Sequence, residues 1–401
     1  MAQAFGDLPS GVLKTPEKFT LRVPDQDLDE FKQLLQLSKI GPETWYNQQE
    51  RDRGRYGITR DWLIGAKDAW LKFDWRKQED RINSFPNFKA KVESAMGTVD
   101  IHFTALFSKR KDAVPIAFMH GWPGSFLEFF PILDLLVKKY PTPDSLPYHV
   151  IVPSLPGYGP SADSVPVDKE PSLQEAAEAL HQMMLDLGFS GYAVQGGDLG
   201  SFISRYMSLH KECKAFHLNM LMTEADGSSE LTQQDLEQLQ RSAEWSRRGT
   251  SYSMSHGLRT ATIGLALSAS PLALLAWIGE KYLEWVDSRY PLQMEVILEV
   301  VSLYWFTSTF PRCIYPYVQR VEDRLAGKSG NIPTSKETPM GYSIFRYDLI
   351  FAPKPWAEKA YPNLKLCRIH EEGGHFAALE RPEALLQDVE DLLKSVQVLE
   401  T

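Results

Sequence analysis

The sequence contains little cysteine, and none of it is spaced for a metal site or a redox pair. Only three cysteines occur, Cys213, Cys313 and Cys367, and no two of them form a CxxC motif. An odd number of widely separated cysteines is not typical of a small secreted domain held by disulfides. We therefore expect reduced thiols in an intracellular protein, packed as small side chains in its core.

Long apolar runs and a targeting segment are also missing. The longest apolar run extends from Ile263 to Gly279, but Ser268, Ser270 and Pro271 interrupt it, and it is shorter than a membrane span requires. We interpret this run as a buried helix. Residues 1–7 lack the basic segment and following apolar segment of a secretory signal. The sequence thus predicts a soluble, cytoplasmic protein without a membrane anchor.

Positive charge is in deficit, because 52 acidic residues outnumber 43 lysines and arginines and give a formal net charge of −9. A protein with this balance is a poor match for nucleic acid or an anionic membrane as its main partner. Low-complexity tracts are absent, and 43% of the 401 residues are apolar. These features are typical of a compact globular protein with one elaborated domain or two smaller ones.

Short apolar segments alternate with helical patterns from about residue 91 onward. A capping box formed by Ser172 and Glu175 begins one of the helices, which runs to Leu187 and stops at Gly188. Such alternation implies a mostly parallel sheet with helices on both faces. The predicted strands are 99–107, 114–119, 149–152, 192–194 and 215–221, followed much later by 343–350 and 364–369.

The chain is expected to contain an N-terminal meander, a sheet domain in two pieces and a helical cap inserted between them. The cap is predicted because the strand pattern stops after residue 221 and aromatic, helical segments follow. A loop rich in Gly, Ser, Pro and Thr at 326–340 leads back to the sheet, and an apolar-faced helix closes the chain. The predicted bounds are 1–90 for the meander, 91–222 and 341–401 for the sheet domain, and 223–340 for the cap.

Within the meander, the spacing of apolar residues predicts one helix at 25–37 and a second from Thr59. The next stretch, 74–88, carries several aromatic residues without a clear period. We interpret it as an irregular segment that packs along the body of the protein.

The segment Gln195-Gly196-Gly197-Asp198-Leu199-Gly200 has the pattern of a tight strand-to-helix elbow, with Asp198 in the place of the more familiar serine nucleophile. Glycines are needed there because the elbow is strained and its backbone passes close to neighbouring elements. A carboxylate at the tip can displace a leaving group at an sp3 carbon and form an ester, so the pattern points to alkyl transfer. By itself the segment also fits a simple turn.

Two residues further along the chain could complete a catalytic set with Asp198. His375 follows two glycines and a predicted strand, a position where catalytic groups collect. It is the predicted general base for the water of a second half-reaction. Asp348 follows the preceding predicted strand and is the predicted acceptor of the imidazole N–H. Each residue alone also fits a structural role, but their order along the chain favours the joint catalytic interpretation.

The segment His120-Gly121-Trp122-Pro123 follows the predicted strand 114–119. In a fold of this kind, the loop at this point donates one backbone N–H to an oxyanion hole, and the residue after the nucleophile donates the other. We therefore expect the amides of Trp122 and Leu199 to stabilise the oxyanion that forms when water attacks the ester of Asp198. The sequence leaves the isomer of the Trp122–Pro123 bond open.

On these motifs the chain resembles the epoxide hydrolases of the α/β-hydrolase fold, nearest the microsomal-type branch that includes the soluble fungal enzymes. The resemblance covers nearly the whole chain and rests on the meander and on segments 120–125, 196–201 and 373–378. It implies a mostly parallel sheet flanked by helices, with an inserted helical cap. It also implies hydrolysis of an epoxide to a vicinal diol through an ester on Asp198, with no metal and no organic cofactor.

In that family two tyrosines of the cap hydrogen-bond the epoxide oxygen and assist its departure. Tyr252 falls where the first is expected, and Tyr317 best matches the second, with Tyr315 as its rival. Together with Trp122 they are the expected substrate-binding residues, in a pocket for a small apolar epoxide. The oligomeric state stays open, although the meander could serve as the surface of a homodimer.

Other functions fit the sequence less well. Haloalkane dehalogenases share the fold and the aspartate nucleophile, but they generally have Trp after it, where this chain has Leu199. A metalloprotease helix needs two histidines four residues apart, whereas His370 and His375 are five apart. The glycines before Asp198 do not form the GxGxxG of a dinucleotide site. A scaffold that only binds a ligand would not need the whole catalytic set.

Overall fold

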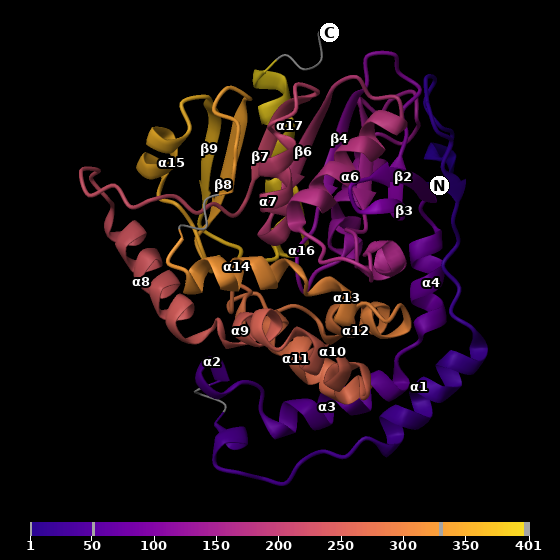
Figure 1. The fold of residues 1–401 in the computed structure, drawn as a ribbon, viewed down its shortest axis with the longest axis vertical. Helices are drawn as coiled ribbons and strands as arrows, with labels where there is room; N and C mark the ends of the chain where they lie inside the picture. The colour runs from indigo at the N-terminus through magenta and orange to yellow at the C-terminus, as the bar shows by residue number, and fades with distance from the viewer. Residues whose placement is uncertain (1, 50–52, 329–331, 397–401) are drawn as a thin grey trace.

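The computed structural model describes residues 2–49, 53–328 and 332–396, and a nine-stranded sheet lies at its centre (Figure 1). The strands lie in the order β1-β2-β3-β5-β4-β6-β7-β8-β9 across the sheet. The pairs from β5 to β9 are parallel, whereas β1, β2, β3 and β5 pair antiparallel in that order. The bounds are β1 Glu17–Lys18, β2 Asn87–Ser94, β3 Gly97–Leu106, β4 Val114–Met119, β5 Tyr148–Pro153, β6 Tyr192–Gly196, β7 Cys213–Leu218, β8 Met340–Phe345 and β9 Leu364–His370.

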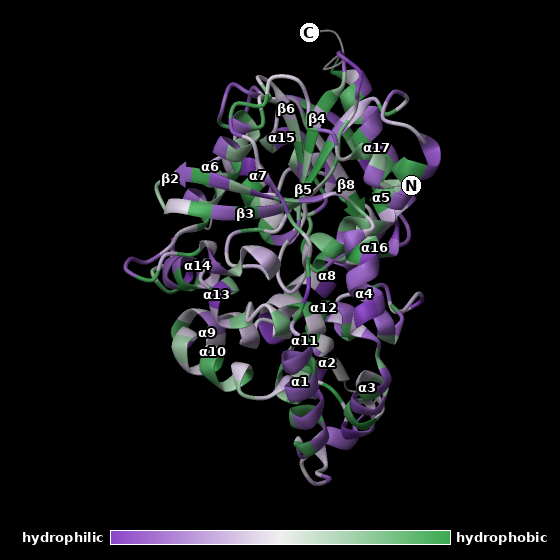
Figure 2. Cartoon of the chain, turned by 90° about the vertical axis from the view of Figure 1, so that its right-hand side faces the viewer, coloured by the Kyte–Doolittle hydropathy of each residue, from purple (hydrophilic) through white to green (hydrophobic). Residues whose placement is uncertain are grey.

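Burial on both faces explains why the strands of the parallel part appear in the sequence as short apolar runs. Every residue of β5, β6 and β8 is buried, as expected for parallel strands covered on both faces. Figure 2 shows the same feature, because apolar residues (green) are concentrated in the central strands such as β4 and β6. The parallel strands run in one direction, so their carboxyl ends meet at one edge of the sheet, where ligand sites of such sheets form.

The sheet begins earlier in the chain than predicted. Residue 90, the expected end of the meander, lies inside β2, and the short strand β1 pairs with β2 at the edge of the sheet. Phe88, Ala90 and Val92 are buried, and between them Lys89 is half-buried and Lys91 is exposed. This alternation is typical of a strand with one solvated face. Such a strand is harder to recognise in a sequence than a continuous apolar run.

Helices cover both faces of the sheet, as the alternating pattern predicts (Figure 1). Helices α6 (Leu173–Asp186) and α7 (Asp198–Met207) belong to one apolar core cluster, and α5 (Phe130–Lys139) and α17 (Pro382–Ser395) to another. The sheet therefore lies between two cores. The predicted capping box of α6 is confirmed, because Ser172 and Glu175 each accept a hydrogen bond from the other's backbone N–H. Two short helices, α15 (Lys354–Ala360) and α16 (Ala377–Glu380), flank β9 in the chain.

The cap is inserted between β7 and β8, and Figure 1 shows its helices together below the sheet. The predicted single helix at 263–279 is wrong, because the chain bends by 116° between α10 and α11. Pro271 cannot continue the first helix but starts the second, with Ser270 as its N-cap. The bounds are α8 Gln233–Arg248, α9 Ser251–Leu258, α10 Thr260–Ser268, α11 Pro271–Glu284, α12 Met294–Phe306, α13 Phe310–Cys313 and α14 Pro316–Leu325. Residues 329–331 of the predicted exit loop lie outside the described residues.

The N-terminal segment runs along one side of the molecule and beneath the cap, as the indigo ribbon in Figure 1 shows. It contains α1 (Asp25–Leu37), α2 (Arg53–Tyr56), α3 (Arg60–Lys72) and α4 (Trp75–Asn83), and α1, α3 and α4 contact cap helices α11 and α12. The helices at 25–37 and after Thr59 are thus confirmed.

The irregular structure predicted for 74–88 is wrong, because α4 occupies most of that stretch. The inward positions of this helix are Trp75, Glu79 and Ile82, so a glutamate stands at the centre of what would be the apolar stripe. The Glu79 carboxylate accepts hydrogen bonds from the Trp75 indole and from the amide of Val23. Those partners offset the cost of burying the carboxylate. The glutamate itself interrupts the apolar period by which a helix is recognised in the sequence.

Among the described residues, no single helix is long and apolar enough to cross a membrane. The bent pair α10 and α11 passes that test by length and composition only, and eight residues of α11 are buried inside the protein.

Candidate active site

Asp198 lies at the tip of the turn that joins β6 to α7. Its backbone φ is +45°, a left-handed value that is uncommon for a residue other than glycine. Such strain persists where the surrounding structure enforces it, most often at functional sites. The enforcing contact here is close, because a Cβ on Gly200 would meet the main-chain carbonyl of Met119 on β4. As the first residue of α7, Asp198 also carries its carboxylate at the positive end of the helix dipole.

The loop after β4 meets the Asp198 carboxylate directly. The amide of Trp122 donates a hydrogen bond to Asp198 Oδ1 at 2.8 Å, and the Trp122–Pro123 peptide bond is cis. Glycine is required at position 121, because a Cβ there would meet the same carboxylate. The buried His120 accepts a hydrogen bond from the amide of Leu155 at 3.1 Å and so ties the loop to the chain after β5.

His375 lies between two carboxylates. Its Nε2 is 3.3 Å from Asp198 Oδ2, and its Nδ1 is 2.8 Å from Asp348 Oδ1. Asp348 Oδ1 also accepts a hydrogen bond from the amide of Leu349 at 2.7 Å, which holds the carboxylate in place. The side chains of His375 and Asp348 are almost completely buried. The structure therefore brings together the three residues that the sequence places 177 positions apart from first to last (375 minus 198).

The charge state of His375 follows from these neighbours. Burial by itself lowers the pKa of the imidazole, but the charge of Asp348 and the hydrogen bonds to Asp198 and Asp348 outweigh it. The result is a pKa raised to about 10, well above its ordinary value of 6.5. His375 is therefore protonated at neutral pH in the resting enzyme.

Glu380 holds the His375 loop, and sequence reasoning missed it. This buried carboxylate accepts hydrogen bonds from the amides of Asp287, Gly374 and Phe376 at 2.8, 2.9 and 3.0 Å. Burial raises its pKa to about 7, although the three amides act in the opposite direction. The signal was present in the sequence, because Glu380 ends the otherwise apolar run Phe376-Ala377-Ala378-Leu379 directly after His375.

The two predicted tyrosines lie on different cap helices and meet above Asp198. Tyr252 on α9 and Tyr317 on α14 are both buried, and their ring centroids are 5.7 Å apart. With Asp198 and His375 they line a cavity of about 890 Å³. Tyr315 lines this cavity too, but its hydroxyl donates to the carbonyl of Pro156 at 3.3 Å.

Buried phenols line this cavity together with cationic side chains, of which Arg320 lies next to the tyrosines. Burial raises the pKa of Tyr252 and of Tyr317, and the charge of Asp198 raises both further. Arg320, one turn after Tyr317 on α14, lowers the pKa of Tyr252 and lies with its guanidinium 4.1 Å from the centre of the Phe202 ring. The phenols are therefore protonated at neutral pH. Sequence reasoning missed Arg320, although its spacing of three from Tyr317 places both on one helix face.

The side chains of Trp122 and Leu199 border different cavities. Leu199 lines the large cavity, whereas the Trp122 indole stacks on the Tyr252 ring with 5.0 Å between centroids and 13° between planes. Among the described residues, Trp122 lines a second, smaller cavity and not the large one. The indole thus supports the ring of Tyr252, and a contact between the Trp122 side chain and the substrate stays a prediction.

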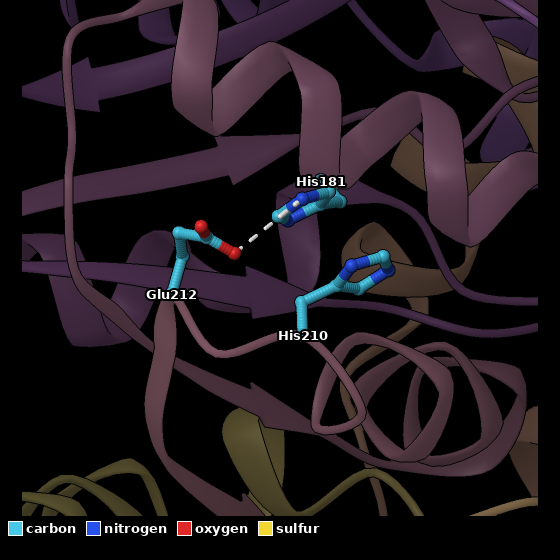
Figure 3. A group of neighbouring side chains, drawn as sticks. All are labelled: His181, His210 and Glu212. Carbon is cyan, nitrogen blue, oxygen red and sulfur yellow. Dashed lines mark ion pairs between the residues drawn. The ribbon is translucent and has the colours of Figure 1, made fainter.

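A second group of titratable side chains lies away from this site, at α6 and the turn before β7 (Figure 3). His181, His210 and Glu212 place their ligand atoms within 4.8 Å of one another. His181 Nδ1 is 2.7 Å from the hydroxyl of Tyr192, and His210 Nε2 is 3.2 Å from Glu178. The two imidazoles stack with 3.7 Å between centroids and 11° between planes. One ion cannot lie in the planes of two parallel rings, so this arrangement gives no metal site without a rotation of a ring.

The fold and the elbow define the class of this protein. A mostly parallel sheet, a strand-turn-helix elbow with an acidic residue at its tip, and a His and an Asp on later loops are the features of an α/β hydrolase. The family model described as "alpha/beta hydrolase fold" matches residues 114–252. The one described as "Epoxide hydrolase N terminus" matches residues 16–129, which covers most of the meander.

Comparison with known proteins then gives the family. The chain is 45% identical to an epoxide hydrolase of Dothistroma septosporum, over 97% of this chain and 92% of that protein. It is 30% identical to epoxide hydrolase 1 of Sus scrofa, over 92% and 87% of the two chains. The structure of Aspergillus niger epoxide hydrolase superposes with a TM-score of 0.88 at 44% identity, over 98% and 99%. The chain belongs to the epoxide hydrolase family and is an epoxide hydrolase.

Proposed function

We propose that this enzyme hydrolyses its epoxide in two stages, through an ester formed on Asp198. The observation that carries the proposal is the position of the Asp198 carboxylate, which contacts the Trp122 amide and His375 and faces Tyr252 and Tyr317 across one cavity. A carboxylate at a strained elbow, with an N–H on one oxygen and the other oxygen toward the base, is arranged to act as a nucleophile.

In the first stage Asp198 Oδ2 attacks one carbon of the epoxide, and the bond from that carbon to the epoxide oxygen breaks. The oxygen becomes an alkoxide, and the hydroxyls of Tyr252 and Tyr317 stabilise it by donating hydrogen bonds. Burial keeps both phenols protonated, so the donors are available at neutral pH. The expected partner is an apolar epoxide, because Leu199, Phe202 and Met220 line the same cavity.

In the second stage water attacks the carbonyl carbon of the ester. Esterification removes the negative charge of Asp198, which helps to raise the pKa of His375 in the resting enzyme. The pKa of His375 therefore falls when the ester forms, so its proton can pass to the alkoxide, which becomes the hydroxyl of the hydroxyalkyl ester. The neutral imidazole that remains is a base for water. Asp348 stabilises the imidazolium that results.

The oxyanion of the second stage forms on Asp198 Oδ1, which already accepts from the Trp122 amide. Leu199 supplies the second donor in this proposal. It is the second residue of α7, so its N–H has no carbonyl partner within the helix. In this proposal the two amides both donate to the oxygen where the charge develops.

The test is to trap the ester in His375→Gln with an aryl epoxide such as styrene oxide. The variant should gain the mass of one epoxide per chain and release little diol, as intact-protein mass spectrometry and chiral chromatography would show. The double variant Asp198→Ala/His375→Gln is the matched control and should gain no mass. Diol release from Asp198→Ala, or equal labelling of the double variant, would contradict the proposal. A haloalkane in the same panel should give no ester.

A further inference from the structure

A small cavity, separate from the substrate cavity, also borders Asp198. Its volume is about 20 Å³, close to the roughly 10–15 Å³ that a single water needs. Asp198 and His375 line both cavities, and they are the residues that the two linings share. Water bound in the small cavity would therefore touch the two reacting groups without standing in the path of the substrate.

The polar side chain that distinguishes this small cavity is Glu128, in the 3-10 turn Phe126–Phe129. Among the described residues, none donates a hydrogen bond to its carboxyl group or forms an ion pair with it. Gly124 makes room for it, because a Cβ there would meet Glu128 Oε2. A carboxyl group enclosed without a protein partner is costly unless water or a proton satisfies it.

The electrostatics of Glu128 connect it to the reacting groups. Burial raises its pKa to about 8, the charge of His375 acts in the opposite direction, and the charge of Asp198 raises it further. Glu128 thus lies close enough to the base and the nucleophile for their charges to affect it. The ordinary structural uses of a buried glutamate, such as the amide contacts of Glu380, are missing here among the described residues.

A second polar side chain of the small cavity is Asn219, just after β7. Its Oδ1 accepts a hydrogen bond from Gln195 Nε2 at 2.8 Å, which fixes the amide and leaves its NH₂ group available. Water in the cavity would then have Glu128, Asn219 and His375 as polar neighbours, and buried waters typically make two to four hydrogen bonds.

We propose that Glu128 is a positioning residue that holds the hydrolytic water in the small cavity, beside His375 and against the carbonyl carbon of the Asp198 ester. This proposal rests on the two-stage function proposed above. The water oxygen bonds to that carbon while its proton passes to His375 Nε2. The bond from the carbon to the diol oxygen then breaks, and the proton passes from His375 to the leaving oxygen. Glu128 neither gains nor loses atoms overall.

The test separates the two stages in a single-turnover experiment with an aryl epoxide, followed by quenched-flow mass spectrometry. In Glu128→Leu the ester should form within about threefold of the normal rate. It should decay about a hundredfold more slowly, the size of loss typical for a misplaced reactant. Glu128→Gln, whose amide oxygen can still hold the water, should recover most of that loss. Glu299→Leu is the matched control, because Glu299 on α12 is also half-buried with a raised pKa but lines neither cavity.

Stability gives the second measurement. Because none of the described residues pairs with the half-buried Glu128 carboxyl group, replacing it with a leucine breaks no contact, so the thermal midpoint of Glu128→Leu should not fall. A loss of ester decay without a loss of stability supports the positioning role. Normal ester decay in Glu128→Leu overturns the proposal, and so does an equal slowing of both stages or the same defect in Glu299→Leu. If His375→Gln accumulates no ester, the two-stage function is wrong, and the proposal for Glu128, which depends on it, is wrong as well.

Discussion

Replacing Asp348 with asparagine should slow hydrolysis of the ester while leaving its formation nearly intact. The exchange fits the structure, because an asparagine oxygen can take the place of Oδ1 and accept from His375 Nδ1 and from the amide of Leu349. The NH₂ group would then occupy the position of Oδ2, which has no hydrogen-bond partner among the described residues. Orientation and tautomer of His375 are thus preserved, and only the negative charge is lost.

The size of the effect follows from that charge. His375 becomes an imidazolium as it takes the proton of water, and the charge of Asp348 stabilises it. Two unit charges about 4 Å apart interact by about 4 kcal/mol at an effective dielectric constant of about 20. Because each 1.36 kcal/mol is a factor of ten, the loss corresponds to about a thousandfold slower decay of the ester. Formation of the ester should change by less than about tenfold, because Asp198 does that step without the base.

The assay is a rapid-quench measurement of protein-bound ester and of diol after one equivalent of epoxide. Asp348→Asn should show a burst of ester followed by slow diol release. Asp388→Asn is the matched control, because Asp388 forms a similar pair with His370, 2.6 Å from its Nε2, outside the site. Ester decay in Asp348→Asn within tenfold of normal would refute the reasoning, since the charge would then not act on the base.

Three further predictions follow from the same geometry. Tyr317→Phe should slow ester formation by about tenfold to a hundredfold in single turnover, whereas Tyr315→Phe should not; the reverse result would move the role to Tyr315. The pKa of His375 is about 10 in the folded protein against an ordinary 6.5, so the folded state retains a proton that the unfolded state releases. The stability due to His375 is complete below about pH 6.5 and is lost as the pH rises toward 10, and urea titrations of the wild type and His375→Gln should converge there. Gly121→Ala should cost at least about a hundredfold in diol formation by displacing the Asp198 carboxylate, and unchanged turnover would contradict the close contact.

Local patterns in the sequence predicted most of the sheet domain and the nucleophile. The strand at 114–119 is confirmed to the residue, and the capping box at Ser172 and Glu175 is confirmed with both of its hydrogen bonds. These features depend on neighbours within a few residues, so the sequence displays them directly. The elbow at Asp198 was also predicted from a local pattern, because the glycines that the tight turn needs are adjacent to Asp198 in the sequence.

The errors arose where a buried charged residue or a proline changed the meaning of a local pattern. Helix α4 was missed because Glu79 occupies the centre of its buried face, where its carboxylate accepts hydrogen bonds from the Trp75 indole and the amide of Val23 and pairs with Arg76 and Arg22. The bend between α10 and α11 depends on Pro271, whose effect on direction the apolar composition obscured. The period of apolar residues shows which residue types repeat, but it does not show which groups satisfy a buried charge.

The sequence by itself therefore determined the fold class, the aspartate at the elbow and the candidates for base and acid. The tertiary structure decided which candidates meet. Tyr315 and Tyr317 are two positions apart, but successive residues of a helix turn by about 100°, so one hydroxyl reaches Pro156 and the other faces Asp198. Glu128 acquired a place beside the nucleophile only because the loop after β4 folds against the elbow. Contacts between segments far apart in the chain depend on packing geometry, which no local pattern encodes.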